Sequence, residues 1–381
     1  MGADGRPLVD VKGMLPMELG ALLSSWGEPA YRGRQLFEWL HHSGGAGFEA
    51  ATALPVSLRE RLQAHASPQV CEVLQRQVDP VDGTVKYLFR LGDGQTVETV
   101  LMRYRYGYTT CVSSQVGCRM GCRFCASTIG GLQRNLSAGE MAEQVAALNR
   151  DLADPARRRD PALFPPPAAD PGASAEAEPA GFDRVSRVVV MGMGEPLENL
   201  DAVLGFLRVV HEPAGAGIGW RHMTVSTSGL VPGIDALAAA ELPLTLAVSL
   251  HAPNDELRDS LVPLNLRYPL ADLLAACRRY VERTRRRLTF EYAMIDRVND
   301  LPEHARELGR LLRRLPGHVN LIPLNPVPGR DLRPSPAESV ERFRALLMGA
   351  GVPCTVRRQL GLSIDAACGQ LRRRATDPTA Q

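Results

Sequence analysis

The chain has 381 residues, of which 45% are hydrophobic and 23% charged, and its formal net charge is +2. The hydrophobic content can fill a sizeable core, in one large domain and a smaller one. The start lacks the basic-then-apolar pattern of a secretory signal, and no apolar run is long enough to span a membrane. We therefore expect a cytoplasmic enzyme without membrane contact. Its eight cysteines are expected to be reduced thiols, to bind metal or to take part in redox catalysis, rather than to form a disulfide framework.

Residues 1 to about 68 are expected to be helical. The clearest amphipathic stretches are Leu15–Trp26 and Arg32–His42. From about Cys71 to Met102 the pattern changes to short strands, separated by Asp82-Gly83 and Asp93-Gly94, which are typical of hairpin turns. We interpret residues 1–105 as a small α+β accessory domain.

From residue 106 to about 350, apolar strand-like stretches alternate with helical ones. The strands are expected at Tyr108–Val112, Val188–Met191, His222–Ser226, Leu244–Leu250, Leu288–Ile295 and His318–Leu324. This α/β alternation predicts a parallel sheet with right-handed crossovers, and six such units form an open, partial (β/α)6 barrel. Residues 351–381 are expected to form a C-terminal segment, to which Pro353–Arg357 would add a seventh strand. Residues 153–180 are rich in alanine and proline, so we interpret them as a mobile surface insertion.

Three cysteines, Cys118, Cys122 and Cys125, have the spacing Cys-x3-Cys-x2-Cys. A [4Fe-4S] cluster is normally held by four thiolates, so three leave one iron open for another ligand and indicate catalysis. The alternative is a structural zinc site, which requires a fourth cysteine or histidine. Cys111 could supply it, but zinc ligands usually come as pairs on both sides of the site, so we favour the iron–sulfur cluster.

Ligands of parallel α/β folds gather at the carboxyl ends of the strands. The cysteine loop follows the first expected strand, and Gly192–Pro196 follow the second, where Glu195 can accept a hydrogen bond from an ammonium group. Ser226–Gly229 and Ser249–His251 follow the next two strands and suit a carboxylate or a ribose. Asn325 follows the sixth strand. Each signal alone is weak, because glycine turns and serine caps end many strands.

The basic residues are nearly all arginine, and they are clustered. The clusters are Arg278-Arg279, Arg283–Arg287, Arg310–Arg314, Arg357-Arg358 and Arg372–Arg374. Such clusters can neutralise phosphates. The alternative is the solvated outer face of an amphipathic helix.

Taken together, the motifs resemble the RlmN/Cfr family of radical S-adenosylmethionine RNA methyltransferases. The matching stretches are residues 14–42, 111–118, 192–197, 249–252, 319–326 and 364–371. The last is the most discriminating, because a general radical S-adenosylmethionine fold does not require a cysteine there. The resemblance implies that residues 106–350 form the radical S-adenosylmethionine barrel and that residues 1–105 help to hold RNA.

The resemblance also implies two cofactors, a [4Fe-4S] cluster on Cys118, Cys122 and Cys125, and S-adenosylmethionine. In this family Cys368 matches a methyl-accepting cysteine, and Cys111 matches the thiol that later attacks it to form a disulfide. Glu98 matches the base that removes the proton from the adenine carbon. The residues that match S-adenosylmethionine contacts are Gly194, Glu195, Ser226, Ser249, Leu250, His251 and Asn325.

The implied product is 2-methyladenosine in the peptidyl-transferase centre of 23S rRNA, with the tRNA adenosine 3′ of the anticodon as a second candidate substrate. Leu360 before Gly361 is more similar to the adenine-C8 branch, whereas Gly194–Pro196 and Phe290–Tyr292 are more similar to the C2 branch. Two alternatives therefore stay open: a C8 methyltransferase, and a non-catalytic, metal-stabilised RNA-binding protein. The expected partners are RNA and an electron donor such as flavodoxin, and the chain is expected to be a monomer.

Overall fold

The computed structural model describes residues 7–43, 47–156, 183–327, 329–361, 363–364 and 371–372. The chain divides into two compact units, of which the first contains residues 1–116, 135–192 and 201–219 and the second contains residues 117–134, 193–200 and 220–381. Cys368 and most of the predicted insertion at 153–180 lie outside the described residues. None of the helices in the described ranges is long and apolar enough to cross a membrane.

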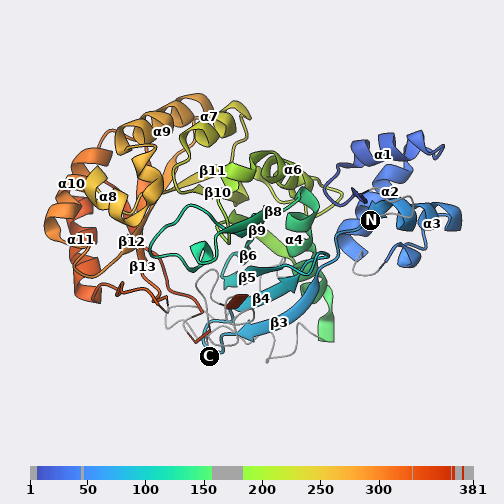
Figure 1. The fold of residues 1–381 in the computed structure, drawn as a ribbon, viewed down its shortest axis with the longest axis horizontal. Helices are drawn as coiled ribbons and strands as arrows, with labels where there is room; N and C mark the ends of the chain where they lie inside the picture. Colours follow the sequence, from blue (N-terminus) through green and yellow to red (C-terminus); the bar gives the residue numbers. More distant parts are fainter. Residues whose placement is uncertain are drawn as a thin grey trace. The chain divides into compact units, whose positions relative to one another are not determined.

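The N-terminal part of the first unit is helical (Figure 1). Its elements are β1 (Val9–Asp10), α1 (Pro16–Ser25), α2 (Arg32–Glu38), the π-helix η1 (Trp39–Ser43), the 3-10 helix η2 (Phe48–Ala50), α3 (Val56–His65) and β2 (Ala66–Ser67), which pairs with β1. Helices α1 and α2 meet at their backbones, because a Cβ on Gly33 would lie 2.3 Å from the backbone nitrogen of Gly20. Both predicted helices are confirmed, but the second ends in a π-helical turn.

A sheet completes most of the first unit. Strands β3 (Glu72–Val78), β4 (Val85–Arg90), β5 (Thr96–Tyr104) and β6 (Gly107–Cys111) are successive antiparallel neighbours, and β9 (Val185–Val190) pairs with β6 in parallel. At the two predicted hairpin turns, Gly83 and Gly94 have φ angles of 72° and 84°, which glycine adopts without strain. The strands expected between Cys71 and Met102 are therefore confirmed.

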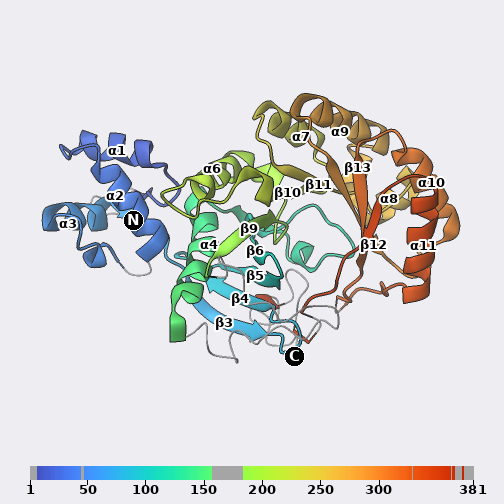
Figure 2. The ribbon, with the colours of Figure 1, turned by 180° about the vertical axis from the view of Figure 1, so that it is seen from behind.

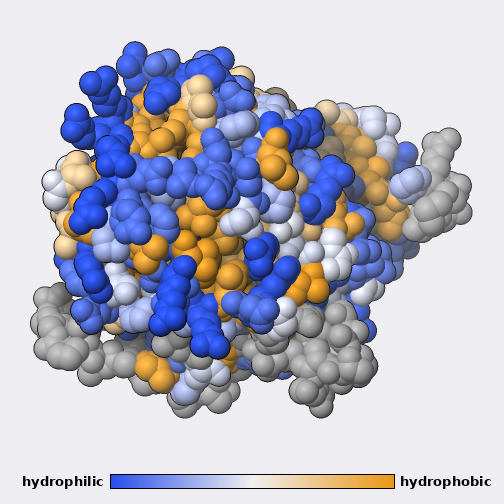
Figure 3. All heavy atoms as spheres, turned by 60° about the vertical axis from the view of Figure 1, so that its left-hand side comes forward, coloured by the Kyte–Doolittle hydropathy of each residue, from blue (hydrophilic) through white to orange (hydrophobic). Residues whose placement is uncertain are grey.

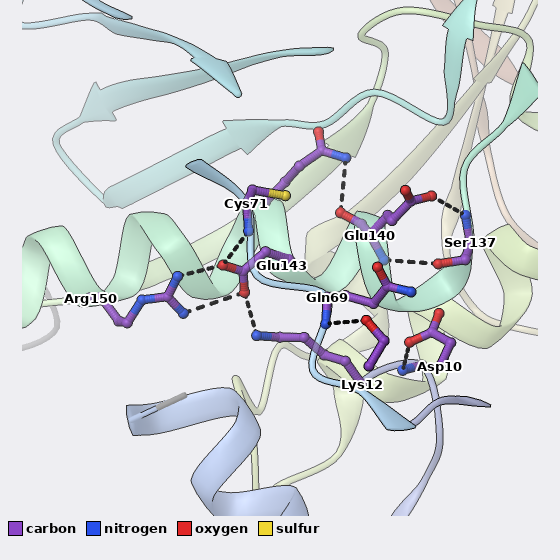
Figure 4. A network of polar contacts seen from close by, with 11 residues as sticks. Asp10, Lys12, Gln69, Cys71, Ser137, Glu140, Glu143 and Arg150 are labelled. Atoms are coloured by element: carbon purple, nitrogen blue, oxygen red, sulfur yellow. Dashed lines mark hydrogen bonds and ion pairs between the residues drawn. The ribbon is translucent and has the colours of Figure 1, made fainter. Parts of the chain in front are cut away.

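Helix α4 (Ala138–Ala153) and helix α6 (Leu200–His211) also belong to the first unit. The α4 side chain of Glu143 accepts hydrogen bonds from the ammonium group of Lys12, from Arg150 and from the backbone N–H of Cys71 (Figure 4). Lys12 and Glu143 are fully buried. Because a buried charge is costly without its partner, this pair holds the segment after β1 to α4.

The second unit has five parallel strands in sequence order. They are β10 (Met223–Thr227), β11 (Thr245–Ser249), β12 (Leu288–Met294), β13 (Gly317–Pro323) and β14 (Cys354–Val356). The α-helices between these strands are α7 (Val231–Ala239), α8 (Asp255–Leu261), α9 (Leu270–Thr284), α10 (Pro302–Leu312) and α11 (Ala337–Gly349). Two short 3-10 helices, η4 (Pro196–Asn199) and η5 (Trp220–His222), precede β10, and a third, η6 (Pro263–Leu266), follows α8. Figure 2 shows α7, α9, α10 and α11 along the strands. The alternation is the one predicted, and all the expected strands are confirmed.

Several arginines of the predicted clusters are paired with acidic side chains. Arg279 donates to Asp235 at 2.8 Å, and Arg283 lies 3.1 Å from Glu241. Hydrophilic side chains cover much of the face shown in Figure 3, with hydrophobic areas between them. These ion pairs reduce the positive charge that the two clusters offer to phosphates, so their contact with RNA stays a prediction.

The buried histidine His41 makes the stability of the first unit depend on pH. Burial, together with the charges of Lys12 and His42, lowers the pKa of His41 to about 3 from the ordinary 6.5. The unfolded chain therefore binds a proton that the folded chain does not, and stability falls as the pH drops from about 6.5 towards 3. We expect the substitution His41→Leu to weaken this fall, measured as the free energy of unfolding in urea across that range. A difference between the two proteins that does not change with pH would contradict the expectation.

Candidate active site

The three cysteines of the predicted cluster lie in one loop of the second unit, between β7 (Gln115–Gly117) and β8 (Leu132–Asn135). At Gly117 the φ angle is 81°, and a Cβ would lie 2.0 Å from the carbonyl oxygen of Gly131. Only glycine fits this position. The backbone N–H of Cys118 donates to the same carbonyl at 3.1 Å. The loop is therefore fixed where the Cys118 side chain begins.

The other end of the loop is held by Thr128, in the 3-10 helix η3 (Ala126–Thr128). Its hydroxyl donates to the carbonyl oxygen of Cys125 at 2.9 Å and lies 3.3 Å from that of Cys122. Cys122 also packs in an apolar cluster with Leu261 and Val262. Local hydrogen bonds and apolar packing therefore fix the backbone from which the second and third thiols extend.

The surroundings of the thiols fit an iron–sulfur cluster. Cys118 and Cys122 are 6% and 8% exposed. Burial raises the pKa of Cys118 to about 12 and also raises the pKa of Cys122, and the neighbouring thiols act in the same direction. A bound cation such as iron would favour the thiolate form, which the cluster requires of its ligands.

The zinc alternative fits less well. Among the residues that the structure describes, no three His, Cys, Asp or Glu side chains are arranged to hold a metal ion. A zinc ion needs four ligands converging on one point. A cubane instead binds each thiolate at a different iron. Three thiolates in one loop therefore match the ligand number of a cubane with an open iron, whereas zinc would need a fourth ligand.

Glu195 is held tightly by its own unit. Its Oε2 atom accepts hydrogen bonds from the backbone N–H and the hydroxyl of Ser228, at 2.7 and 2.8 Å, and its Oε1 atom accepts one from the backbone N–H of Leu197 at 3.1 Å. Burial raises the pKa of Glu195, and the hydrogen bonds from Ser228 oppose that rise. The preceding Gly194 has a φ angle of 107°. Glu195 thus joins the loop after Gly194 to the loop after β10, a role that the sequence did not indicate.

The other predicted residues lie at the ends of β10 and β11. Ser226 in β10 and Ser249 at the end of β11 are half-buried, and Leu250, which follows β11, is buried. Nδ1 of His251 accepts a hydrogen bond from the backbone N–H of Ala293 at 3.0 Å, so Nε2 carries the proton.

Two further observations define the state and place of His251. Burial, together with the charge of Arg258, lowers its pKa to about 3, so it is neutral at physiological pH. The His251 ring meets the edge of Phe124 with centroids 4.5 Å apart, and Phe124 lies in the cysteine loop. A predicted S-adenosylmethionine contact is therefore beside the predicted cluster loop.

Arg258 of α8 links the strand-end loops and was not among the predicted residues. This fully buried guanidinium donates to the carbonyl oxygens of Ser228, Ser249 and Leu250 at 2.6, 3.1 and 3.1 Å. It also donates to the side chain of Asn265 at 2.8 Å. One side chain therefore holds the loops after β10 and β11 together.

Asn325, the last predicted contact, follows β13 and is half-buried. Its side-chain oxygen lies 3.4 Å from the amide nitrogen of Gln359, which is a long hydrogen bond. The structure thus places Asn325 beside the segment that leads towards the C-terminus.

The first unit carries Glu98 and Cys111. The strand register places Cys111 opposite Val100, and Val100 opposite Lys86. Because directly paired residues point to the same side and side chains alternate along a strand, all four residues share one face of the sheet. Glu98 and Cys111 are 3% and 7% exposed. The two predicted catalytic residues are thus on the same face, on neighbouring strands.

Gln144 of α4 holds the backbone around these two residues. Its Oε1 atom accepts hydrogen bonds from the hydroxyl of Thr99 and the backbone N–H of Ser113, both at 2.8 Å. Its amide nitrogen donates to the carbonyl oxygen of Ser113 at 2.9 Å, and the Ser113 hydroxyl donates to the carbonyl oxygen of Glu98 at 2.7 Å. The end of β6 and the middle of β5 are therefore fixed to one another.

The chain is similar to known proteins over nearly its whole length. It is 50% identical over 365 residues to a probable dual-specificity RNA methyltransferase RlmN of Symbiobacterium thermophilum, covering 95% of this chain and 91% of the relative. It is 49% identical to the protein of the same name from Pelotomaculum thermopropionicum, covering 97% and 94%. The crystal structure of a radical SAM methyltransferase from Sphaerobacter thermophilus superposes with a TM-score of 0.84 at 45% identity, covering 96% of this chain and 99% of that one.

The chain belongs to the RlmN family of radical S-adenosylmethionine RNA methyltransferases. Residues 9–67 match the ribosomal RNA large subunit methyltransferase N-terminal domain, and residues 174–309 match the radical SAM superfamily. The predicted fold, a radical S-adenosylmethionine α/β core behind an N-terminal domain, is confirmed. Enzymes of this family use the two predicted cofactors, a [4Fe-4S] cluster and S-adenosylmethionine.

RlmN-family membership does not by itself assign roles to residues of this chain. The stretch matched to the radical SAM superfamily includes Glu195, His251 and Arg258 but begins after the cysteine loop. The boundary predicted at residue 105 stays a prediction. Sequence reasoning missed Arg258, Gln144 and Lys86, because an arginine or glutamine in an amphipathic helix and a lysine in a strand give no distinct signal.

Proposed function

We propose that the protein methylates carbon 2 of adenine in 23S rRNA, with the tRNA adenosine 3′ of the anticodon as a second substrate. The observation that carries the proposal is the common face of Glu98 and Cys111, which puts a carboxylate base and a thiol on neighbouring strands. The relatives named as dual-specificity RNA methyltransferases support it, as does the N-terminal domain named for large-subunit ribosomal RNA. These names favour carbon 2 over carbon 8 and over a protein that only binds RNA.

In this proposal Cys118, Cys122 and Cys125 hold the cluster. When bound, the cluster and S-adenosylmethionine supply the adenosyl radical, which removes a hydrogen atom from a methyl group on Cys368. His251 offers its Nε2–H to S-adenosylmethionine, and Arg258 keeps the loops of the cofactor site in place. The other residues proposed to contact S-adenosylmethionine are Gly194, Glu195, Ser226, Ser249, Leu250 and Asn325.

Three residues act on the RNA adduct. Cys368, which lies outside the described residues, carries the methylene group that bonds to the adenine carbon. Glu98 accepts the proton from that carbon. With the loss of that proton the adduct radical would also give up one electron, back to the oxidised cluster, and become a closed-shell thioether. Cys111 then attacks the sulfur of Cys368, so that a disulfide forms and the sulfur–methylene bond breaks with its electron pair on the methylene carbon. A proton completes the methyl group, and the methylated RNA leaves.

The proposed partners follow from this chemistry. RNA is the substrate, and the N-terminal domain and outer arginines contribute phosphate contacts. An electron donor such as flavodoxin reduces the cluster, and the chain works as a monomer. Solution scattering of the protein alone tests the monomer, and replacement of flavodoxin by a chemical reductant tests the donor.

The direct test is mass spectrometry of nucleosides from 23S rRNA and tRNA after anaerobic incubation with reconstituted protein, S-adenosylmethionine and a reductant. We expect 2-methyladenosine from both RNAs. Formation of 8-methyladenosine would replace the proposal by the C8 reaction. If neither forms while S-adenosylmethionine is cleaved, the RNA substrate assignment fails. The variant Cys368→Ala should bind RNA and give no product.

A further inference from the structure

The chain has only two lysines, Lys12 and Lys86, among its 44 basic residues. Both side chains are fully buried, and each is paired with a glutamate, Lys12 with Glu143 and Lys86 with Glu98. In a chain that uses arginine for every other cation, lysine occurs only inside buried ion pairs. Lysine suits such places because its ammonium is a compact charge with three donors. The larger guanidinium of arginine has five donors in a planar fork, and a buried site would have to provide partners for all of them.

The second pair includes the proposed catalytic base. Nζ of Lys86 lies 2.8 Å from Oε2 of Glu98, and the two side chains are 0% and 3% exposed. Lys86 on β4, Val100 on β5 and Cys111 on β6 lie opposite one another in the sheet. Glu98 lies on β5, two residues before Val100. The ammonium group therefore lies on the face of the sheet that carries both proposed catalytic groups.

Both the backbone and the side chain of Glu98 are held by neighbouring residues. Its backbone carbonyl accepts the hydroxyl of Ser113, and the next residue, Thr99, is held by Gln144. Lys86 fixes its side-chain oxygen from the neighbouring strand. The ammonium group of Lys86 is thus in direct contact with the carboxylate, and it comes from the neighbouring strand.

A buried carboxylate needs such a partner in order to remain charged. Removal from water disfavours the charged form strongly, and a cation at hydrogen-bond distance offsets much of this penalty. A general base must be a carboxylate rather than a carboxylic acid to accept the proton of the adenine carbon, so a cation in contact with it suits this step.

We propose that Lys86 is a positioning residue for the methyl transfer, which holds the carboxylate of Glu98 in place on the face that carries Cys111. This inference rests on the proposed function, in which Glu98 is the base. In this inference Lys86 acts through Glu98. Its effect is confined to the proton-removal step, after the protein–RNA adduct has formed.

Lys12 provides a matched control. It is the same residue type, equally buried and paired with a glutamate in the same unit. Its partner Glu143 also binds Arg150 and the backbone N–H of Cys71, and it belongs to a different network from Glu98 (Figure 4). The variant Lys12→Met therefore reports the loss of a buried lysine pair without loss of the partner of Glu98.

The experiment compares wild type, Lys86→Met and Lys12→Met as reconstituted full-length proteins with an RNA substrate. For each, the readouts are 5′-deoxyadenosine, covalent protein–RNA adduct and 2-methyladenosine, all per folded protein. We expect Lys86→Met to form 5′-deoxyadenosine and adduct, and to release product at least about tenfold more slowly, in line with the contribution of a general base. Lys12→Met should lose thermal stability but keep the wild-type ratio of product to adduct.

A second readout is specific to the proton transfer. With RNA carrying deuterium at carbon 2 of the target adenine, Lys86→Met should show a larger isotope effect on product formation than wild type, because removal of that proton has become slower. A purely structural role would not change this isotope effect. Lys86→Arg covers the case in which Lys86→Met does not fold. It keeps the charge but replaces the compact ammonium by a larger planar group, so the carboxylate is displaced, and we expect slower release and a raised isotope effect that are smaller than in Lys86→Met.

The outcomes separate the two proposals. If both Lys86 variants release product with the wild-type ratio and isotope effect, the role of Lys86 is wrong while the proposed function stands. If Lys12→Met changes the ratio as much as Lys86→Met does, the effect is structural and the inference is likewise wrong. If the wild type gives neither adduct nor 2-methyladenosine, it is the proposed function that fails.

Discussion

Replacing Arg258 by leucine should destabilise the second unit by about 3 kcal/mol or more, because buried carbonyl oxygens and an amide lose their donors together. The affected groups are the carbonyls of Ser228, Ser249 and Leu250 and the side chain of Asn265. Two of those carbonyls belong to the proposed S-adenosylmethionine site. Binding of S-adenosylmethionine should therefore weaken by roughly tenfold or more, since 1.4 kcal/mol corresponds to a factor of ten.

The measurements are urea unfolding and equilibrium binding of S-adenosylmethionine to the reconstituted protein. The control is Arg279→Leu, which removes an arginine that is 51% exposed and paired with Asp235 in the same unit. Exposed pairs contribute about 1 kcal/mol or less, so this variant should unfold and bind nearly as the wild type does. Equal losses in the two variants would show that Arg258 does not organise the loops.

The substitution Cys122→Ala should abolish the iron–sulfur cluster and, with it, cleavage of S-adenosylmethionine and RNA methylation. A three-thiolate set that loses one member cannot hold a cubane with an open iron. The folded chain should survive, because exchanging a buried sulfur for hydrogen leaves only a small cavity in the apolar cluster around Leu261 and Val262.

The measurements are iron content, visible absorbance after anaerobic reconstitution, and 5′-deoxyadenosine formation. Cys277→Ala is the matched control, because Cys277 is also fully buried in the second unit, in α9. It should keep the cluster and its chemistry. A reconstituted Cys122→Ala protein with the iron content of the wild type would mean that this thiol is not a ligand.

The parallel strands could be predicted because they are buried. In β11, Leu246, Ala247 and Val248 are all fully buried, so the sequence has a short apolar run between polar segments. The end of the second helix could not be predicted in the same way. Leu36, Phe37, Leu40 and His41 continue the apolar face into η1, and this periodicity does not distinguish an α-helical turn from a π-helical one.

The residues of the candidate site also fall into those that a local sequence pattern indicates and those that only the folded structure brings together. The cysteine motif could be found because its members are close in sequence. Arg258 and Gln144 could not, because their partners lie 30 and 31 residues away, at Ser228 and Ser113. The pairing of Lys86 with Glu98 could not be predicted either, because it depends on the register in which β4 and β5 pair. Interactions that depend on tertiary structure leave no local pattern in the sequence.

The burial of both lysines determines how the protein reacts with amine-directed labels. Apart from the amino terminus, the chain presents an amine to such a reagent only when Lys12 or Lys86 leaves its glutamate partner. Labelling at each lysine is therefore limited by a local or global opening of the fold. Mass spectrometry of the labelled peptides would give the labelling rate of each lysine with one reagent. The rate at Lys12 reports the release of the N-terminal segment from α4, and the rate at Lys86 reports the opening of the sheet.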